Sequence, residues 1–242
     1  MILGAMGDSI SRGYDIQALA QEDLPDNWST GTDLPNSLLN ELNTTFQPTG
    51  SFSGVNVAVV GDSVLGSNST FAQQAAQLAA QTPQVVTVEI GANDVCQGNL
   101  ATSGASTTFK NDVVTALQTL VNSPNPPKSI VVLSIPHIFN LTQIPALAAN
   151  SVCPIAWNLL CPNLQVGQAT FDAQWTEANL ALQQAATMIG GPVIYDGGAV
   201  ASTTFAAADV SSIDCFHPSV SGQEKIASAV WQVLETSLNV VF

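Results

Sequence analysis

The chain has 242 residues, of which 46% are hydrophobic and only 9% are charged, so it is long enough to bury one sizeable core. Its 18 acidic and four basic residues give a net charge of −14, which argues against nucleic acid and anionic membranes as partners. No apolar run is long enough to cross a bilayer, and the opening run lacks the charged start of a signal peptide. We therefore expect a single domain over residues 1–242, without a transmembrane segment.

Five short apolar runs are predicted strands. Each is nearly continuous in Val, Ile and similar residues, without strict alternation, and ends at a Gly, a Pro or a polar turn. This composition is typical of strands buried on both faces of a parallel sheet. The runs cover residues 2–6, 55–60, 85–90, 130–135 and 193–195.

Longer segments with helical periodicity alternate with these strands. In the last of them, Ile226, Val230 and Leu234 recur at a spacing of four residues, with Val233 beside them, and form one apolar stripe. Alternation of strands and helices predicts an α/β fold in which helices cover both faces of a parallel sheet. The predicted helices cover residues 34–42, 71–80, 108–122, 171–188 and 219–238.

The segment 136–167 has no clear period and is unusually apolar for a loop. Loops of this length and composition are usually functional or pinned in place. Its apolar side chains either line a groove for an acyl chain or pack the loop onto the sheet, and the sequence supports both interpretations. They are Ile138, Phe139, Leu141, Ile144, Leu147, Trp157, Leu159 and Leu160.

Two motifs at opposite ends of the chain carry the groups of a serine hydrolase. Ser9 follows the first predicted strand, and Asp214 lies three residues before His217. An imidazole that is oriented by a carboxylate can activate a serine hydroxyl. The other histidine, His137, has no acidic residue near it in the sequence, and we expect it to be structural or to contact substrate.

Gly-Asp-Ser occurs twice, at residues 7–9 and again at residues 61–63 after the second strand. Local context alone does not separate Ser9 from Ser63. A further candidate follows the third strand, where Asn93 in Gly-Ala-Asn-Asp brings a side-chain amide to the same edge of the sheet. Such amides stabilise oxyanions, although this tetrapeptide could also be an ordinary turn.

These blocks together, in this order and across nearly the whole chain, resemble the four sequence blocks of the GDSL, or SGNH, hydrolases. The resemblance implies a flavodoxin-like three-layer α/β/α sandwich with a five-stranded parallel sheet. It also implies that Ser9 is the nucleophile, His217 the general base and Asp214 the orienting carboxylate. The oxyanion hole would consist of the Ser9 and Gly61 N–H groups and the Asn93 side chain, which leaves Ser63 without a catalytic role.

Cysteines within two of the blocks depart from the common pattern of this family. The sequences of these two blocks, Asn-Asp-Val-Cys at 93–96 and Asp-Cys-Phe-His at 214–217, are most similar to those of the phospholipase B branch of the family. The even number of cysteines indicates two disulfides and an oxidising compartment. We expect Cys153–Cys161 and Cys96–Cys215 bridges, while the other two pairings remain open.

The sequence thus predicts a serine hydrolase of carboxylic esters, an esterase or a lipase of the phospholipase type, that acts through an acyl-enzyme without a metal or another cofactor. A carbohydrate O-acetyl esterase is the alternative, and a non-catalytic carbohydrate-binding module on the same scaffold is a weaker one. We expect a secreted monomer with a small-molecule or lipid ester as substrate. Four Asn-x-Ser/Thr sequons, at Asn27, Asn43, Asn68 and Asn140, are compatible with secretion.

Overall fold

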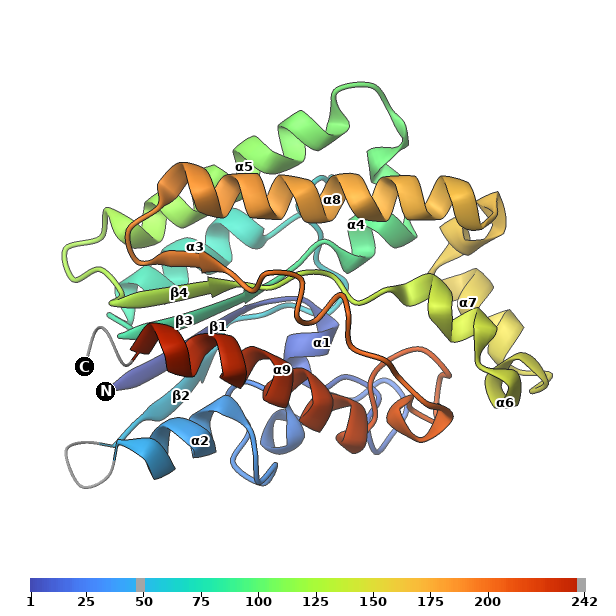
Figure 1. Cartoon of the computed structure of the whole chain (residues 1–242), viewed down its shortest axis with the longest axis horizontal. Helices are drawn as coiled ribbons and strands as arrows, with labels where there is room; N and C mark the ends of the chain where they lie inside the picture. The colour runs from blue at the N-terminus through green and yellow to red at the C-terminus, as the bar shows by residue number, and fades with distance from the viewer. Residues whose placement is uncertain (47–50, 239–242) are drawn as a thin grey trace.

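A five-stranded parallel sheet forms the centre of the computed structural model, which describes residues 1–46 and 51–238 (Figure 1). The strand order is β2-β1-β3-β4-β5, and every neighbouring pair is parallel. This is the flavodoxin-like order, so the predicted fold class is confirmed. The strands are β1 (Ile2–Gly7), β2 (Ser53–Asn56), β3 (Val85–Glu89), β4 (Ser129–Val132) and β5 (Val193–Tyr195).

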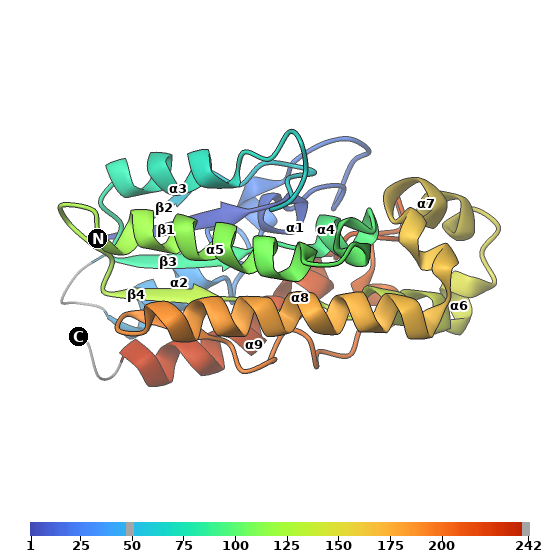
Figure 2. The same cartoon turned by 90° about the horizontal axis from the view of Figure 1, so that it is seen from above.

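Helices cover both faces of the sheet. On one face lie α3 (Phe71–Ala80), α5 (Ala105–Val121) and α8 (Gln168–Ile189), and on the other lie α2 (Leu38–Thr45) and α9 (Val220–Leu238), as Figures 1 and 2 show. The core between these layers includes the fully buried rings of Trp28, Phe109 and Phe171. Among the helices of the described segments, none combines the length and the apolar character that spanning a membrane requires.

Several predicted boundaries differ from the observed ones by one to four residues, among them those of the second strand and of the first predicted helix. The second strand ends at Asn56 rather than at residue 60, although the N–H groups of Val57 and Val59 still donate to β1 carbonyls. Helix α2 begins at Leu38 rather than at residue 34, because the Ser37 hydroxyl accepts from the Asn40 N–H and caps the helix there.

The segment 136–167 is folded into short helices rather than an irregular loop. It contains α6 (Pro145–Ala148) and α7 (Cys153–Leu160), with 3-10 turns at Ile138–Gln143 and Pro162–Val166. These helices lie beyond the carboxyl ends of the strands (Figures 1 and 2). The inner side of α7 carries Cys153, Trp157 and Cys161, which are all buried and recur every four residues, so they share one helix face.

The expected disulfide pairing is wrong. Cys96 is bonded to Cys161 and Cys153 to Cys215. The bridge that was expected between Cys153 and Cys161 would join the two ends of one helix. Because α7 is helical, each end instead reaches a different segment at the carboxyl edge of the sheet.

The strand order creates a crevice at this edge. Strands β2 and β3 lie on opposite sides of β1, and the chain leaves β1 toward α2 on one face and β3 toward α5 on the other. Loops that diverge from neighbouring parallel strands leave a ligand-binding crevice at their carboxyl ends. Ser9 follows β1 and Asn93 follows β3, so both lie at this switch point.

Candidate active site

Ser9 opens the short helix α1 (Ser9–Arg12) at the end of β1. The turn requires glycine at position 7, because a Cβ there would lie 1.9 Å from the Glu89 carbonyl oxygen, and its φ is +150°. The side chain of Gln74 holds this glycine from both sides, at 2.8 Å to its N–H and 2.9 Å to its carbonyl. Asp8 caps α1 by accepting from the Ile10 N–H at 2.9 Å. The backbone that presents Ser9 is therefore tightly fixed.

Ser9, His217 and Asp214 form one hydrogen-bonded chain. His217 Nε2 lies 2.8 Å from Ser9 Oγ, and His217 Nδ1 is hydrogen-bonded to Asp214 Oδ2. The other oxygen of Asp214 accepts from the N–H groups of Phe216 and His217, at 2.9 and 3.1 Å. All three side chains are buried. Residues that lie more than 200 positions apart are thus brought together as the sequence predicted.

The electrostatic environment keeps Asp214 ionised. Burial acts to raise the pKa of this carboxyl, but the hydrogen bond and charge of His217, with the two backbone N–H groups, bring it below its ordinary value. An ionised Asp214 favours the tautomer in which Nδ1 carries the proton. Nε2 is then free to accept the proton of Ser9.

The Asn93 side chain lies beside the Ser9 turn, and Gly61 precedes Asp62, whose carbonyl binds this side chain. The Asn93 amide donates to the Asp62 carbonyl at 2.8 Å and has a longer contact of 3.3 Å with Asp8 Oδ2. Gly61 has a φ of +77°, and within the described residues its N–H donates no hydrogen bond. The Ser9 N–H, at the first position of a helix, has no partner within that helix either. The Ser9 N–H and the Asn93 amide can thus donate to an oxygen in the pocket that both residues line.

The second Gly-Asp-Ser sequence has a local structural role. Ser63 Oγ accepts from the Gly66 N–H at 3.0 Å. The Asp62 carboxylate binds both the N–H and the hydroxyl of Thr70, at 2.9 and 2.8 Å, just before α3 begins. It also accepts from Gln74, the residue that holds the Ser9 turn. The hydrogen bonds of this motif therefore stabilise a turn and a helix start.

A pair of buried carboxyls lies beneath the Ser9 turn, and sequence reasoning missed it. Burial and the neighbouring charge of Glu89 raise the pKa of Asp8 well above its ordinary value. Burial likewise raises the pKa of Glu89 to about 7. The Ser11 hydroxyl donates to Glu89 at 3.1 Å. The sequence did contain a signal, because Glu89 is an acidic residue at the end of a strand that otherwise consists of valines and one threonine.

Asp15 is a second neighbour that the motif blocks did not indicate. Its carboxyl, Asp214 and His217 place one oxygen or nitrogen each within 4.8 Å of one another. Burial raises the pKa of Asp15, and the charge of Asp214 adds to this effect. Such a cluster could in principle hold a cation, but both His217 ring nitrogens are already bonded, to Asp214 and to Ser9. A metal here would have to break that hydrogen-bonded chain.

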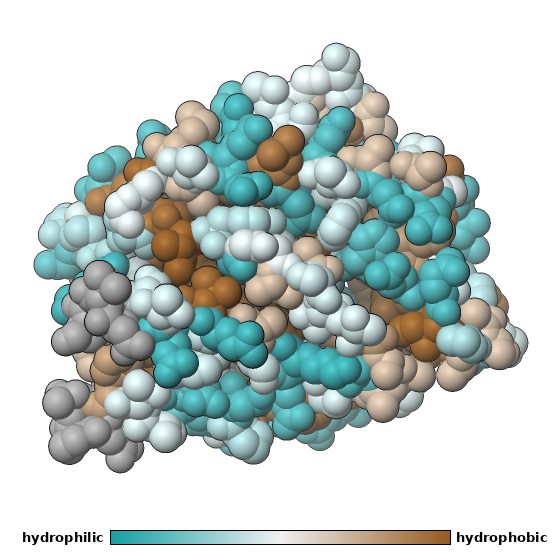
Figure 3. Space-filling view, in the orientation of Figure 1, coloured by the Kyte–Doolittle hydropathy of each residue, from teal (hydrophilic) through white to brown (hydrophobic). Residues whose placement is uncertain are grey.

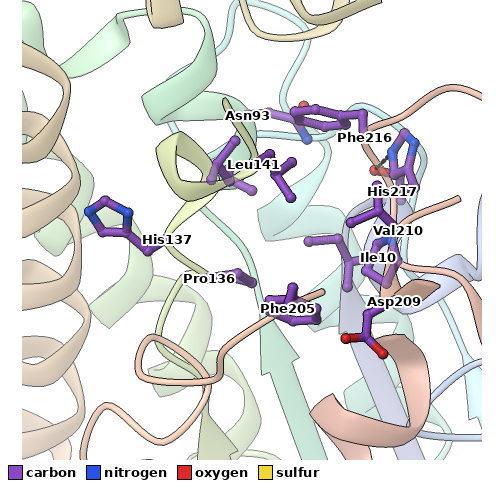
Figure 4. Close-up of a pocket in the computed structure, with 14 residues that line it drawn as sticks. Ile10, Asn93, Pro136, His137, Leu141, Phe205, Asp209, Val210, Phe216 and His217 are labelled. Carbon is purple, nitrogen blue, oxygen red and sulfur yellow. Dashed lines mark hydrogen bonds between the residues drawn. The ribbon is translucent and has the colours of Figure 1, made fainter. Parts of the chain in front are cut away.

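His137 faces away from Ser9. Its imidazole lies 3.1 Å from the Asp172 carboxylate and contacts the Trp175 ring edge-on, with centroids 4.4 Å apart. Both partners belong to α8, toward which His137 points in Figure 4. The acid that is missing from its sequence neighbourhood thus comes from a distant helix. This contact fits the structural role expected for His137, and the alternative role of contacting substrate stays open because His137 also lines the pocket beside Ser9.

A mainly apolar pocket adjoins Ser9 and His217 (Figure 4). Two of the apolar residues of segment 136–167 line it, whereas Phe139, Leu147 and Trp157 pack into the core and Leu159 is exposed. Some residues of this segment thus line the pocket, and others pack the segment onto the sheet. The apolar side chains that line the pocket include those of Ile10, Ile138, Leu141, Phe205, Val210 and Phe216.

Comparison with known proteins agrees with this architecture. Residues 3–230 match the family model described as "GDSL-like Lipase/Acylhydrolase". No curated protein matches the sequence. An acetylxylan esterase from Geobacillus stearothermophilus is 18% identical over 96% of this chain and 92% of its own, with a TM-score of 0.56. A candidate GDSL-like lipase from Parabacteroides merdae is 18% identical over 97% of this chain and 95% of its own, with a TM-score of 0.61. These solved structures share the fold.

Proposed function

The chain belongs to the family of GDSL-like lipases and acylhydrolases and is a carboxylic ester hydrolase; from this premise we propose that Ser9, His217 and Asp214 are its catalytic residues. The observation that carries the proposal is the 2.8 Å contact between Ser9 Oγ and His217 Nε2, with Asp214 on the other ring nitrogen. A non-catalytic binding module on this scaffold would not need that arrangement.

In the proposed reaction, Ser9 Oγ attacks the ester carbonyl carbon while its proton passes to His217 Nε2. The tetrahedral intermediate collapses when the imidazolium returns this proton to the departing alkoxide, which leaves as an alcohol. A water molecule then attacks the acyl-enzyme with His217 again as the base. The carbonyl is re-formed, the acid is released, and the proton returns to Ser9.

The oxyanion of each intermediate would accept from the N–H groups of Ser9 and Gly61 and from Asn93 Nδ2. The Asn93 amide is already oriented by its bond to the Asp62 carbonyl, and its other N–H has only the 3.3 Å contact with Asp8. Exchanging this long contact for a short bond to an oxyanion would stabilise the transition state more than the ground state.

The acyl group is the part of the substrate that we assign to the pocket. Its apolar lining by Leu141, Phe205 and Phe216 favours a hydrocarbon chain over a hydrated sugar. We therefore propose that the substrate is a lipid ester of the kind that a phospholipase cleaves. An O-acetylated carbohydrate, such as the acetylxylan of the structurally similar esterase, is the alternative.

A secreted monomer is the form that we propose. Two disulfides in the described chain suit an oxidising compartment. The sequon at Asn27 adds nothing, because Asn27 is fully buried and its side-chain oxygen accepts from the N–H groups of Ser29 and Thr30. The net charge of −14 makes nucleic acid an unsuitable partner.

Replacing each of the two serines tests the assignment of the nucleophile. Ser9→Ala should abolish hydrolysis of p-nitrophenyl esters, whereas Ser63→Ala should keep most of it, because Ser63 only supports a turn. The reverse pattern would move the nucleophile to the second motif. A panel of p-nitrophenyl esters of rising chain length, with phosphatidylcholine and acetylated xylan included, separates the two substrate classes. Activity confined to acetyl esters would exclude the lipid assignment.

A further inference from the structure

Residues 129–171 contain no Asp, Glu, Lys or Arg, although the chain has 18 acidic and four basic residues elsewhere. The segment begins with β4, continues through the 136–167 helices and ends in the first turn of α8. In a protein with a net charge of −14, this segment is therefore a long stretch without formal charge, apart from His137 when it is protonated. It provides the surface at the carboxyl end of the sheet, where α6 and α7 lie (Figure 1).

Helix α7 exposes large apolar side chains on its outer face. Val152, Ile155 and Leu159 have exposed fractions of 57%, 62% and 77%. Their spacing of three and four residues places them on one side of the helix. We call these three residues the α7 patch. In Figure 3 the end of the molecule that carries α6 and α7 in Figure 1 shows brown and tan side chains.

The inner face of α7 is fastened to two of the segments that carry the candidate site. Cys153 is bonded to Cys215, which lies between Asp214 and His217. The Trp157 indole N–H donates to the Cys215 carbonyl at 2.7 Å. At the other end Cys161 is bonded to Cys96, in the short helix α4 (Ala92–Cys96) that also carries Asn93. The patch therefore cannot fold inward to bury itself without disrupting the site.

We propose that the α7 patch docks the enzyme onto a zwitterionic phospholipid surface, from which the ester substrate is drawn. The inference rests on the proposed function as a lipid ester hydrolase. Apolar side chains that enter the boundary between headgroups and acyl chains supply the binding free energy. The uncharged segment permits this approach, whereas the acidic remainder of the chain opposes binding to anionic lipid.

Sedimentation with phosphatidylcholine vesicles tests this proposal. The wild-type protein should partition onto the vesicles, and the double variant Ile155→Ser/Leu159→Ser should lower the partition coefficient roughly tenfold or more, because two large exposed side chains lose their apolar contact. The matched control is Leu180→Ser/Met188→Ser, at two α8 side chains with exposed fractions of 50% and 62%. This control should bind like the wild type. All three proteins should hydrolyse soluble p-nitrophenyl acetate at equal rates.

Further measurements separate the possible outcomes. Ser9→Ala should still bind the vesicles while it loses ester hydrolysis, so failure of the docking and failure of the catalytic assignment are distinguishable. Adding phosphatidylserine should weaken binding. Equal partition of the two double variants would overturn the proposal. A second result would also overturn it: the wild-type protein self-associates in sedimentation velocity, Ile155→Ser/Leu159→Ser abolishes this self-association, and neither protein binds vesicles. The patch would then be an interface between copies of this chain.

Discussion

Asn93 occupies a position from which its side-chain amide can reach an oxygen bound at Ser9. Its orientation comes from the Asp62 carbonyl, at 2.8 Å, so the amide is arranged before any substrate arrives. Preorganised donors of this kind strongly stabilise oxyanions in acyl transfer.

Asn93→Ala should lower kcat about a hundredfold or more with little change in KM, since the lost hydrogen bond would form mainly in the transition state. Steady-state kinetics on a p-nitrophenyl ester measure this effect. Asn99→Ala is a suitable control, because Asn99 contacts Asp94 at 3.5 Å and not the Ser9 turn. An unchanged kcat in Asn93→Ala would mean that Asn93 is only structural.

Glu89 gives the folding stability a dependence on pH. Because burial raises its pKa from 4.5 to about 7, the folded protein holds this proton more tightly than the unfolded chain does. The contribution of Glu89 to stability is therefore complete below about pH 4.5 and is lost as the pH rises through 7.

Glu89→Gln removes this titration and keeps an acceptor for Ser11. Relative to the wild type, the variant should gain roughly 3 kcal/mol of stability between pH 4.5 and pH 8, since the pKa of Glu89 is raised from 4.5 to about 7. Urea unfolding of both proteins at the two pH values measures the gain. The exposed residue Glu235, changed to Gln, serves as the control. A difference that does not change with pH would show that the pKa of Glu89 is the same in the folded and the unfolded chain.

At the scale of elements, the two disulfides at the ends of α7 can be compared directly, because they close loops of similar length. The bonded cysteines are 65 residues apart in one bridge and 62 in the other. The entropy that each removes from the unfolded chain is therefore nearly the same, equivalent to about 4 kcal/mol per bridge. Only the Cys153–Cys215 bridge joins the turn that carries Asp214 and His217.

The two double variants Cys96→Ser/Cys161→Ser and Cys153→Ser/Cys215→Ser should thus lose similar stability in thermal unfolding. Ester hydrolysis should be measured well below both melting temperatures and should fall mainly in the Cys153/Cys215 variant. Cys215 lies between Asp214 and His217, and its backbone is in the left-handed region, with a φ of +58°. We expect its disulfide to help hold this turn in the observed conformation. Equal losses of activity would show that the catalytic turn does not depend on its own bridge.

The sequence predicted the regular elements well because their patterns are local. Apolar runs marked all five strands, and the βαβ alternation indicated the three layers. Segment 136–167 was harder, because Pro145, Pro154 and Pro162 interrupt the periodicity that identifies helices. The recurrence of Cys153, Trp157 and Cys161 every four residues was the signal of α7. Recognising it would have excluded the expected bridge between the two ends of that helix.

The candidate site was predictable as far as its residues belong to motifs. Ser9, Asn93, Asp214 and His217 were named from ordered blocks, and the structure brings them together, while their catalytic roles remain a proposal. Asp15 and Glu89 were not predicted, since their importance depends on burial and on contacts between distant segments, which no local pattern records.

At the scale of the whole molecule, the charge imbalance acts on the folded state. A net charge of −14 on a chain with only four basic residues means that most carboxylates have no cationic partner. Two of the few ion pairs in the described structure are Arg12–Glu22 and Lys225–Asp209. Mutual repulsion of the remaining acids destabilises the compact state.

Raising NaCl from about 0.02 M to about 0.5 M should therefore raise the melting temperature at pH 7 by a few degrees, because added ions screen this repulsion. Differential scanning fluorimetry measures the shift. Near the sequence pI of about 4.1, where the net charge vanishes, the same addition should have little effect. A salt response of the same size at both pH values would point to a cause other than charge repulsion.

The two disulfides also determine how the chain responds to proteolysis. Their loops overlap, since Cys153 lies inside the loop that Cys96–Cys161 closes and Cys161 lies inside the loop that Cys153–Cys215 closes. A single cut anywhere between Cys96 and Cys215 consequently leaves two fragments that remain covalently joined until they are reduced. The segment with Ser9 lies outside this closed region. One cut upstream of Cys96 and downstream of Ser9 would therefore leave Ser9 attached to the rest only by noncovalent packing.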